Sequence, residues 1–370
     1  SLPLFWLAEQ GLRVLVWGAH QFAHLPAASL RLPTPHLLTL LPLYATLFSW
    51  PHLTRREGRL SWKAALLLLG LSLLVFRDGY GYYRHSGSLR VTFLDVGQGE
   101  AALLEFPNGK TMLIDGGGSF SDDFDMGEMV VAPFLWDKGM RRIDILVLSH
   151  PHADHLKGLL FLLDTFQVGQ LWDNGSAVRT PSYLRLRARA EAKGIYHPLT
   201  EPTTFPSAAF GGVEVQVLHP SPPFTRSLQT RYAPTDDPYL NNRSLVLRLR
   251  YGEVSFLFTG DLEETGEQHL VEAYRGRLRT TVLKVPHHGS RTSSSLPFLQ
   301  EVQPAVAVIS VGAMNWLHYP HPQVLRRYQS QGIRVLRTDR QGAITIETTG
   351  QGYRISTSPR PSLFSSRKKD

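Results

Sequence analysis

The sequence contains no cysteine among its 370 residues. This absence excludes a framework of disulfide bonds and every metal site built on thiolate ligands, although it does not identify the cellular compartment. Acidic residues are outnumbered by basic ones, 31 against 39, which gives a formal net charge of +8. An excess of this size suits a polyanionic partner and an anionic lipid surface equally well. The length allows one large domain with a smaller part, and the initial Ser predicts a fragment of a longer protein.

Charged residues are missing from two apolar runs near the N-terminus, residues 32–54 and Ala64–Phe76. About 20 apolar residues span a bilayer, so the first run predicts a transmembrane helix that its four prolines make imperfect. The second run is shorter and spans only if the flanking Trp, Lys, Arg and Tyr side chains anchor it at the interface. Two buried core helices are the alternative interpretation.

Residues 4–25, ahead of these runs, mix apolar side chains at helical spacing with charged residues and histidines. We interpret them as an interfacial amphipathic helix or as part of a larger membrane bundle. The loop at residues 55–63, RREGRLSWK, is cationic and is therefore expected on the cytoplasmic side. If the second run crosses the membrane, the chain after Tyr83 lies on the outer, periplasmic face. Residues 1–83 are thus expected to end a membrane domain.

From about Leu89 the chain changes to short strand-like runs separated by turn residues. The segments FPNGKT and RYGEVS predict hairpins. Helical patterns fall between some of the strands, at Val130–Lys138, Leu156–Phe166, Ser182–Ala192, Leu262–Tyr274 and Pro322–Gln331. This alternation predicts an α+β fold of two packed sheets with helices outside, over residues 84–350. Residues 351–370 are typical of a disordered basic tail.

The densest group of potential metal ligands is SHPHADH, which directly follows the apolar run IDILVL. A polar turn at a strand end projects its side chains from the rim of the sheet. His150 and His152 can face one ion there, while Asp154 and His155 face a second about 3.5–4 Å away, so that the two ions share a water and lower its pKa. Imidazole and carboxylate ligands suit zinc or manganese. Surface and helix-capping histidines are the plainer alternative.

The run HPHADH matches the H-x-H-x-D-H signature of the metallo-β-lactamase fold, and the chain resembles that superfamily further along. The resemblance implies an αββα sandwich and makes Asp261, in FTGDL, the carboxylate that bridges the metals. It takes the later ligand from LKVPHHGS, where either His287 or His288 could serve. His288 precedes the glycine and matches better, which leaves His287 to support a ligand or contact substrate. Asp115, after TMLI, would lie near the site and orient ligands.

One element of the superfamily pattern is missing. Many members carry another histidine, between the signature and the bridging aspartate, that completes the first metal site. In this interval the chain has only His197 and His219, and YLNNRSLVL stands at the expected place. Asn242 could bind weakly through its amide oxygen or hold a metal-bound water. Alternatively, Asn241 and Asn242 only turn the chain into the next strand.

Longer motifs resemble the C-terminal domain of ComEC-type competence proteins, the inner-membrane DNA-uptake channels of bacteria. They are VTFLDVGQGEAALLEFPNGKTMLIDGG, PFLWDKGMRRIDILVLSHPHADHLKGL, NNRSLVLRLRYGEVSFLFTGDLE and LKVPHHGSRTSSS. The first includes Asp95 and has Glu100 where a familiar version has Asp. The resemblance implies transmembrane helices before the domain, two zinc or manganese ions, and hydrolysis of the DNA strand that is not transported. A DNA receptor and a helicase are the partners it implies.

In such a nuclease Asp154 would belong to the catalytic centre, and a proton must reach the leaving oxygen. His287, Lys284 or a metal-bound water could supply it. Ser290 and Arg291, just after the histidine pair, could hold phosphate oxygens, or they could form a plain polar loop. Two other functions remain open: hydrolysis of another substrate on the same fold, such as a lactone or a phosphorylcholine ester, and a non-catalytic gate for the channel.

Overall fold

The computed structural model describes residues 2–23, 40–41, 44, 48, 64, 66–67, 69–73, 87–118, 124–229, 240–313 and 315–358. The chain divides into two units, one formed by Ser1–Leu74 with Trp136–Gly139 and one by the remainder. In the first unit, helix α1 (Leu2–Ala23) confirms the expected helix, and Arg13 pairs with Glu9 one turn away at 2.7 Å. Its interfacial role stays a prediction.

The first expected span, residues 32–54, lies largely outside the described residues. The second, Ala64–Phe76, is described at 64, 66, 67 and 69–73, where the residues are helical, and its crossing of a membrane stays a prediction. Among the residues that are described, no helix combines the length and the apolar character that crossing a membrane requires.

The second unit contains two mixed sheets. The first sheet has the order β15 (Tyr353–Ser358), β14 (Ala343–Thr348), β1 (Leu89–Phe93), β2 (Ala102–Glu105), β3 (Thr111–Ile114), β4 (Arg142–Val147), β5 (Gln167–Asp173) and β6 (Tyr196–Pro198). The second has the order β13 (Arg334–Arg337), β12 (Val306–Ile309), β11 (Val282–Lys284), β10 (Val254–Phe258), β9 (Val246–Tyr251), β8 (Glu214–His219) and β7 (Thr203–Phe205). The expected hairpins are confirmed as the antiparallel pairs β2–β3 and β9–β10.

Each sheet has a parallel portion, and this portion positions the candidate site. Strands β3 to β6 run parallel in the first sheet, and β10 to β13 run parallel in the second. Parallel neighbours end at the same edge of a sheet, so the residues that follow them gather at one rim. Asp115 follows β3 and His150 follows soon after β4, whereas Asp261 follows β10 and His287 follows β11. The chemistry-bearing residues thus come from equivalent edges of the two sheets.

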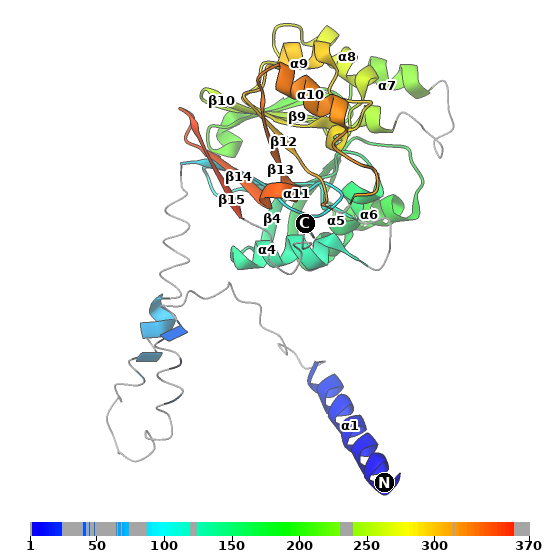
Figure 1. The fold of residues 1–370 in the computed structure, drawn as a ribbon, viewed down its shortest axis with the longest axis vertical. Helices are drawn as coiled ribbons and strands as arrows, with labels where there is room; N and C mark the ends of the chain where they lie inside the picture. The colour runs from blue at the N-terminus through cyan, green and yellow to red at the C-terminus, as the bar shows by residue number, and fades with distance from the viewer. Residues whose placement is uncertain are drawn as a thin grey trace, which may run out of the picture. The chain divides into compact units, whose positions relative to one another are not determined.

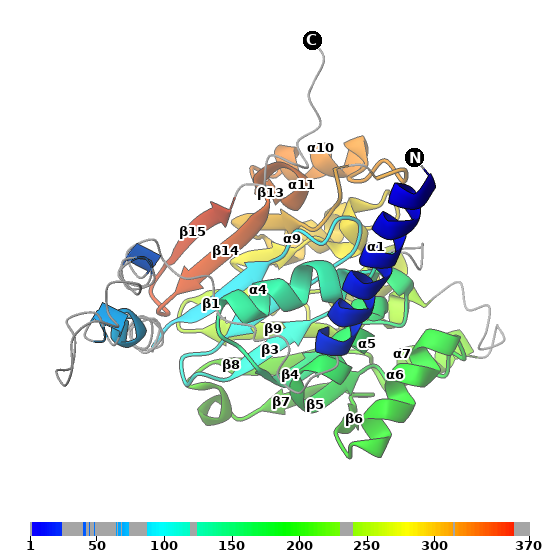
Figure 2. The ribbon, with the colours of Figure 1, turned by 90° about the horizontal axis from the view of Figure 1, so that it is seen from below.

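Helices cover both outer faces, which gives the predicted αββα order (Figure 1). On the side of the first sheet lie a π-helical turn (Gly127–Val131), α4 (Ala132–Asp137), α5 (Ala153–Thr165) and α6 (Pro181–Ala192). On the side of the second lie α8 (Glu264–Ala273), α9 (Leu296–Val302) and α10 (Pro322–Ser330). The connections contain α7 (Pro222–Gln229), α11 (Thr338–Gln341) and 3₁₀ turns at Ser207–Phe210, Asn241–Arg243 and Pro286–Gly289. Figure 2 shows β3, β4 and β5 side by side.

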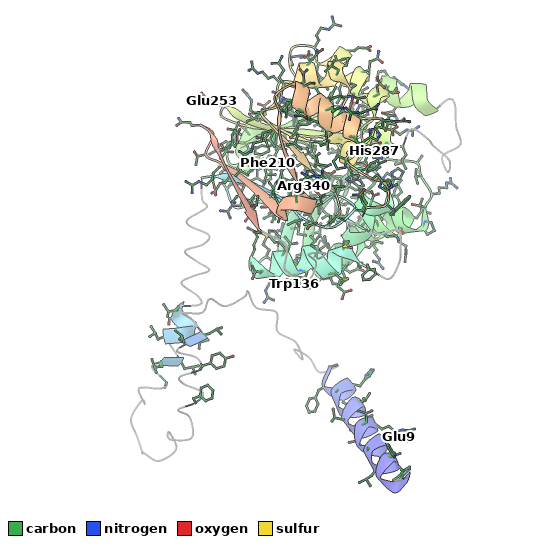
Figure 3. All side chains as sticks on the ribbon, in the orientation of Figure 1. Glu9, Trp136, Phe210, Glu253, His287 and Arg340 are labelled. Atoms are coloured by element: carbon green, nitrogen blue, oxygen red, sulfur yellow. The ribbon has the colours of Figure 1, made fainter. Side chains whose placement is uncertain are left out.

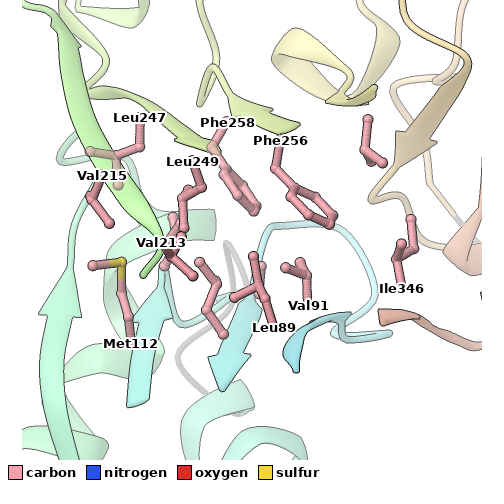
Figure 4. Packing of buried hydrophobic residues seen from close by; sticks show 14 of the residues in the cluster. Leu89, Val91, Met112, Val213, Val215, Leu247, Leu249, Phe256, Phe258 and Ile346 are labelled. Carbon is pink, nitrogen blue, oxygen red and sulfur yellow. The ribbon is translucent and has the colours of Figure 1, made fainter. Parts of the chain in front are cut away.

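The main core lies between the sheets, where alternate side chains of both face each other (Figure 4). Val91 and Phe93 point inward from β1, and Phe256 and Phe258 point inward from β10. The rings of Phe93 and Phe258 stack with centroids 5.8 Å apart. Each such buried side chain contributes about 1.5–3 kcal/mol, so the inter-sheet core fixes how the two rims oppose each other.

The C-terminal boundary expected from the sequence is wrong. Residues 351–370 were expected to form a disordered tail, but Tyr353–Ser358 form β15, which pairs antiparallel with β14 from Ala343 to Thr348. Most side chains of β15 are exposed, so the sequence shows no apolar alternation there. Backbone pairing with β14 and the packing of Ile355 against the core hold the strand at the sheet edge. The folded unit therefore continues to Ser358.

Candidate metal centre

The signature motif lies where β4 turns into α5. The backbone N–H of Leu148 still donates to Trp172 O at 2.8 Å, and α5 begins immediately after His152, its N-cap residue. Two glycines let the loop after β3 press against this turn. A Cβ on Gly118 would lie 1.9 Å from the carbonyl oxygen of Ala153, and one on Gly158 would lie 2.1 Å from that of Gly116. A larger residue at either position would push α5 away from the rim.

Four of the predicted ligands form a buried group that we call the second cluster: Asp154, His155, Asp261 and His288. Their donor atoms all lie within 4.8 Å of one another. His155 Nε2 lies 3.3 Å from Asp261 Oδ1. His288 Nε2 lies 3.4 Å from Asp154 Oδ2 and 3.5 Å from Asp261 Oδ1. The sheets thus bring together side chains more than a hundred residues apart around one point.

The two histidines of this cluster are oriented by hydrogen bonds on their far sides. His155 Nδ1 lies 2.8 Å from Asp115 Oδ2, and Asp115 also accepts bonds from the backbone and hydroxyl of Ser149 at 2.7 Å. His288 Nδ1 donates to the carbonyl oxygen of Ser310 at 2.8 Å. A carbonyl accepts only from N–H, so the Nε2 of His288 is left with a lone pair for a metal. Asp115 therefore lies directly behind His155, and its role in orienting a metal ligand stays a prediction.

A first cluster joins His150, His152 and Asp261, again with donor atoms within 4.8 Å of one another. His150 Nε2 lies 3.0 Å from His152 Nδ1 and 3.8 Å from Asp261 Oδ2. Asp261 thus turns one carboxylate oxygen toward each cluster, which is the geometry of a bridging ligand.

The donor sets fit divalent ions. His155 Nε2, His288 Nε2 and Asp261 Oδ1 are buried and have no hydrogen-bond partner in the described part of the chain. An unsatisfied buried polar atom costs about 1–3 kcal/mol, and a cation at this point would satisfy all three at once. Nitrogen and oxygen donors without sulfur suit zinc or manganese.

The pKa values of the histidines separate the clusters. Burial and the neighbouring charge of His155 bring the pKa of His150 well below its ordinary value, and burial also lowers the pKa of His152. For His155 burial has the same effect, but Asp261 and other carboxylates outweigh it and raise its pKa well above the ordinary value. The pKa of His288 is raised to about 9, because Asp261 again outweighs burial. The carboxylates of the second cluster thus stabilise positive charge on its histidines, as they would on a bound cation.

Asn242 does not have the ligand role considered from the sequence. Its Oδ1 accepts hydrogen bonds from the backbone N–H groups of Glu263 and Gly266, at 3.1 and 2.9 Å. The buried amide therefore holds the start of α8 in place after Asp261. His219 is buried elsewhere, where its Nε2 donates to the carbonyl oxygen of Asn242 at 2.9 Å, and burial lowers its pKa to about 3.

Lys284 is also placed differently from a proton donor. Its ammonium group is buried in an ion pair with Glu100 and also donates to the carbonyl oxygen of Val285 at 3.1 Å. The pair ties the rim of the second sheet to the connection between β1 and β2. Since both partners are buried, Lys284 serves as a structural link, and the predicted proton transfer finds no support in its contacts.

The remaining predicted residues lie around the centre. His287 is half-buried, with Nε2 3.8 Å from Asp261 Oδ2 and Nδ1 3.3 Å from a carboxylate oxygen of Glu263. Ser290 is buried and its hydroxyl contacts that of Thr292 at 3.0 Å, whereas Arg291 is exposed. Asp95 accepts a bond from Gly97 N at 3.4 Å in its own loop. Substrate contacts by these residues stay predictions.

Two contributors to the site were missed from the sequence. Glu263 lies beside His287. Its position two residues after Asp261, in GDLEE, is the sequence feature that could have predicted a place near the site. Ser310 contributes a backbone carbonyl, which any residue could supply, so the sequence carries no signal for it.

The layered sheets and the two clusters that share Asp261 are features of one class of metallo-hydrolase. Residues 94–313 match the family model of the metallo-beta-lactamase superfamily. The chain belongs to that superfamily.

More specific similarity points to competence proteins. The chain is 34% identical to ComE operon protein 3 of Bacillus subtilis (strain 168), over 69% of this chain and 32% of that protein. It is also 34% identical to competence protein ComA of Neisseria gonorrhoeae, over 91% of this chain and 42% of that protein. The chain is thus a relative of the competence proteins in their metallo-β-lactamase region, and it spans less than half their length.

A solved structure was also found, that of Igni18, a metallo hydrolase from Ignicoccus hospitalis. It is 15% identical and covers 70% of this chain and 98% of its own, with a TM-score of 0.41.

Proposed function

We propose that the metal centre hydrolyses phosphodiester bonds of DNA, and that this reaction removes the strand that is not transported during DNA uptake. The observation that carries the proposal is the pair of clusters joined by the two oxygens of Asp261, at a rim formed by both sheets. The similarity to competence proteins supports DNA as the substrate.

The charge of the donor set favours an anionic substrate. Two divalent ions carry four positive charges, and Asp154 and Asp261 offset two of them when the histidines are neutral. The excess attracts a phosphodiester and stabilises the charge that develops on its oxygens. When bound, such a pair of ions lowers the pKa of water to near neutrality and polarises the phosphoryl group.

The chain's own residues keep the centre rigid and set its protonation. Asp115 and the carbonyl of Ser310 fix the rings of His155 and His288, so that both present Nε2. Tight orientation matters because a small misplacement of reacting groups costs orders of magnitude in rate. His287 is partly exposed, with Nε2 3.8 Å from Asp261 Oδ2, so it lies on the face of the centre that substrate can reach.

The cellular setting follows from the same similarity. We propose that the chain is part of a multi-pass inner-membrane protein, with the metal centre on the periplasmic face and with a DNA receptor and a helicase as partners. The net charge of +8 suits both DNA and an anionic membrane surface.

A nuclease assay tests the proposed function. The purified 370-residue chain should cleave linear and plasmid DNA with added Mn²⁺ or Zn²⁺, and a chelator should abolish cleavage. Asp154→Ala should remove the activity, while His197→Ala, which changes an exposed histidine outside both clusters, should leave it unchanged. Hydrolysis of lactones or phosphorylcholine esters with no cleavage of DNA would contradict the proposal.

A further inference from the structure

The first cluster has fewer imidazoles than its superfamily pattern leads one to expect. His150 and His152 face it, but the histidine that many members add before the bridging aspartate is absent, and the Asn242 amide is occupied by backbone N–H groups. A ligand from another part of the chain would restore the set.

His287 is in position to be that ligand. Its Nε2 lies 3.8 Å from Asp261 Oδ2, and His150 Nε2 lies at the same distance from the same oxygen. Donors that share one tetrahedral zinc ion at about 2.0–2.1 Å lie about 3.3 Å apart, so these separations are close to those of a shared ion. The second cluster repeats the arrangement around Oδ1, with histidine nitrogens at 3.3 and 3.5 Å.

A carboxylate lies near the far side of the His287 ring, where metal-binding histidines usually have a partner. His287 Nδ1 lies 3.3 Å from Glu263 Oε1. The carboxylate of Glu263 is fixed in turn by the Thr292 hydroxyl at 2.9 Å and by the amide of Asn242 at 3.4 Å. Glu263 thus lies behind His287 on the side where Asp115 lies behind His155, but at 3.3 Å it does not complete the hydrogen bond that Asp115 makes at 2.8 Å. In both histidines Nε2 faces Asp261.

The backbone at this point is unusual in a way that serves both clusters. His287 and His288 are consecutive and both left-handed, with φ of 49° and 53°. Side chains other than Gly, Asn and Asp seldom adopt this conformation, and strained positions persist where function requires them. Here the turn directs the two rings to opposite oxygens of Asp261. Figure 3 labels His287 among the side chains of the second unit, which also contains the labelled Phe210 and Arg340.

We propose that His287 binds the metal ion of the first cluster, in place of the histidine that this chain lacks, while His288 binds the ion of the second. His287 does not belong to the group of donor atoms that lie within 4.8 Å of one another, so its ring would have to move toward Asp261 Oδ2 to share an ion with His150 and His152. The inference rests on the metal centre of the proposed function but not on DNA as its substrate, so the two can fail separately.

The test isolates the first cluster before changing His287. Asp154→Ala removes a ligand that belongs only to the second cluster, and this variant should bind one Mn²⁺ per chain in equilibrium dialysis. Adding His287→Gly should lower the affinity for that remaining ion by at least about tenfold. Adding His288→Gly instead should leave its affinity unchanged. Glycine adopts positive φ freely, so neither substitution adds backbone strain.

Two further measurements make the result decisive. Melting of the metal-free variants by circular dichroism should show that all remain folded. Electron paramagnetic resonance of the Asp154→Ala chain loaded with Mn²⁺ should show a nitrogen hyperfine pattern that changes with His287→Gly and stays with His288→Gly. Equal affinity and an unchanged spectrum after His287→Gly would overturn the proposal, even if the chain cleaves DNA.

Discussion

The two clusters share Asp261 but differ in how the protein surrounds them. In the second cluster every donor residue is buried, and the imidazoles of His155 and His288 are fixed from behind by Asp115 and the carbonyl of Ser310. The first cluster is more open, since His152 and His287 are only partly buried. A buried, oriented donor set binds a metal more tightly than an open one. We therefore expect the second cluster to hold its ion more tightly, and the first to offer the face that substrate can reach.

The largest effect on metal binding and activity is expected from removing Asp261, the residue that belongs to both clusters. Asp261→Ala should release both ions, because each cluster loses an oxygen ligand. The rate of hydrolysis should fall roughly 10³-fold or more, because the transition state loses several kcal/mol of stabilisation. Dialysis with elemental analysis would count the ions, and Asp164→Ala, in an exposed pair with Arg189, is the matched control. One tightly bound ion in Asp261→Ala would show that the clusters are independent.

The buried ion pair between Lys284 and Glu100 should contribute to the stability of the fold. Lys284→Met leaves the Glu100 carboxylate buried without its partner, and breaking a buried pair in this way costs about 3–5 kcal/mol. Denaturant unfolding of the metal-free chain measures the loss. The double variant Glu100→Gln with Lys284→Met should recover part of it. An unchanged midpoint for Lys284→Met would mean that the pair does not hold the sheets together.

The clusters should also differ in pH dependence. In the metal-free protein His288 has a raised pKa of about 9 and the pKa of His155 is also raised, so both carry protons at pH 7 that an ion must displace. Affinity of the second cluster should rise with pH up to about 9, by about tenfold per unit for each proton displaced. The first cluster should depend little on pH there, because His150 and His152 have lowered pKa values.

Calorimetry in buffers of different ionisation enthalpy measures these protons directly. Metal binding to the wild type should release more protons at pH 7 than binding to Asp154→Ala, in which only the first cluster remains intact. Equal proton release by the two proteins would contradict the assignment of charge.

The smallest effects are expected from the carboxylates behind the histidines. Asp115→Asn should lower the affinity of the second cluster for its ion by roughly 10–100-fold. Glu263→Gln should lower the affinity of the first cluster by a similar factor. Isothermal titration with Mn²⁺ resolves the two affinities. If Glu263→Gln weakened the tighter ion instead, the comparison between the clusters would be reversed.

The sequence predicts one part of this site well, because the signal is local. His150, His152, Asp154 and His155 lie within one turn, and Asp261 follows an apolar strand, so residue type and spacing are sufficient. Most strands with clear apolar alternation are predicted for the same reason, whereas the exposed β15 is not.

Contacts between distant segments could not be predicted. Lys284 and Glu100 are 184 residues apart, and their pairing depends on how the two sheets pack. The role of Asn242 depends on the start of α8. The choice between His287 and His288 depends on two left-handed residues in succession, which the sequence HHG does not reveal. In each case the deciding interaction is tertiary and leaves no local pattern.

The measurement that tests the central claim most directly is anomalous diffraction at the manganese edge from crystals grown with Mn²⁺. Two peaks about 3.5–4 Å apart are predicted, one beside Asp154 and His288 and one beside His150 and His152, with Asp261 between them. A single peak, or two peaks that do not share Asp261, would contradict the account.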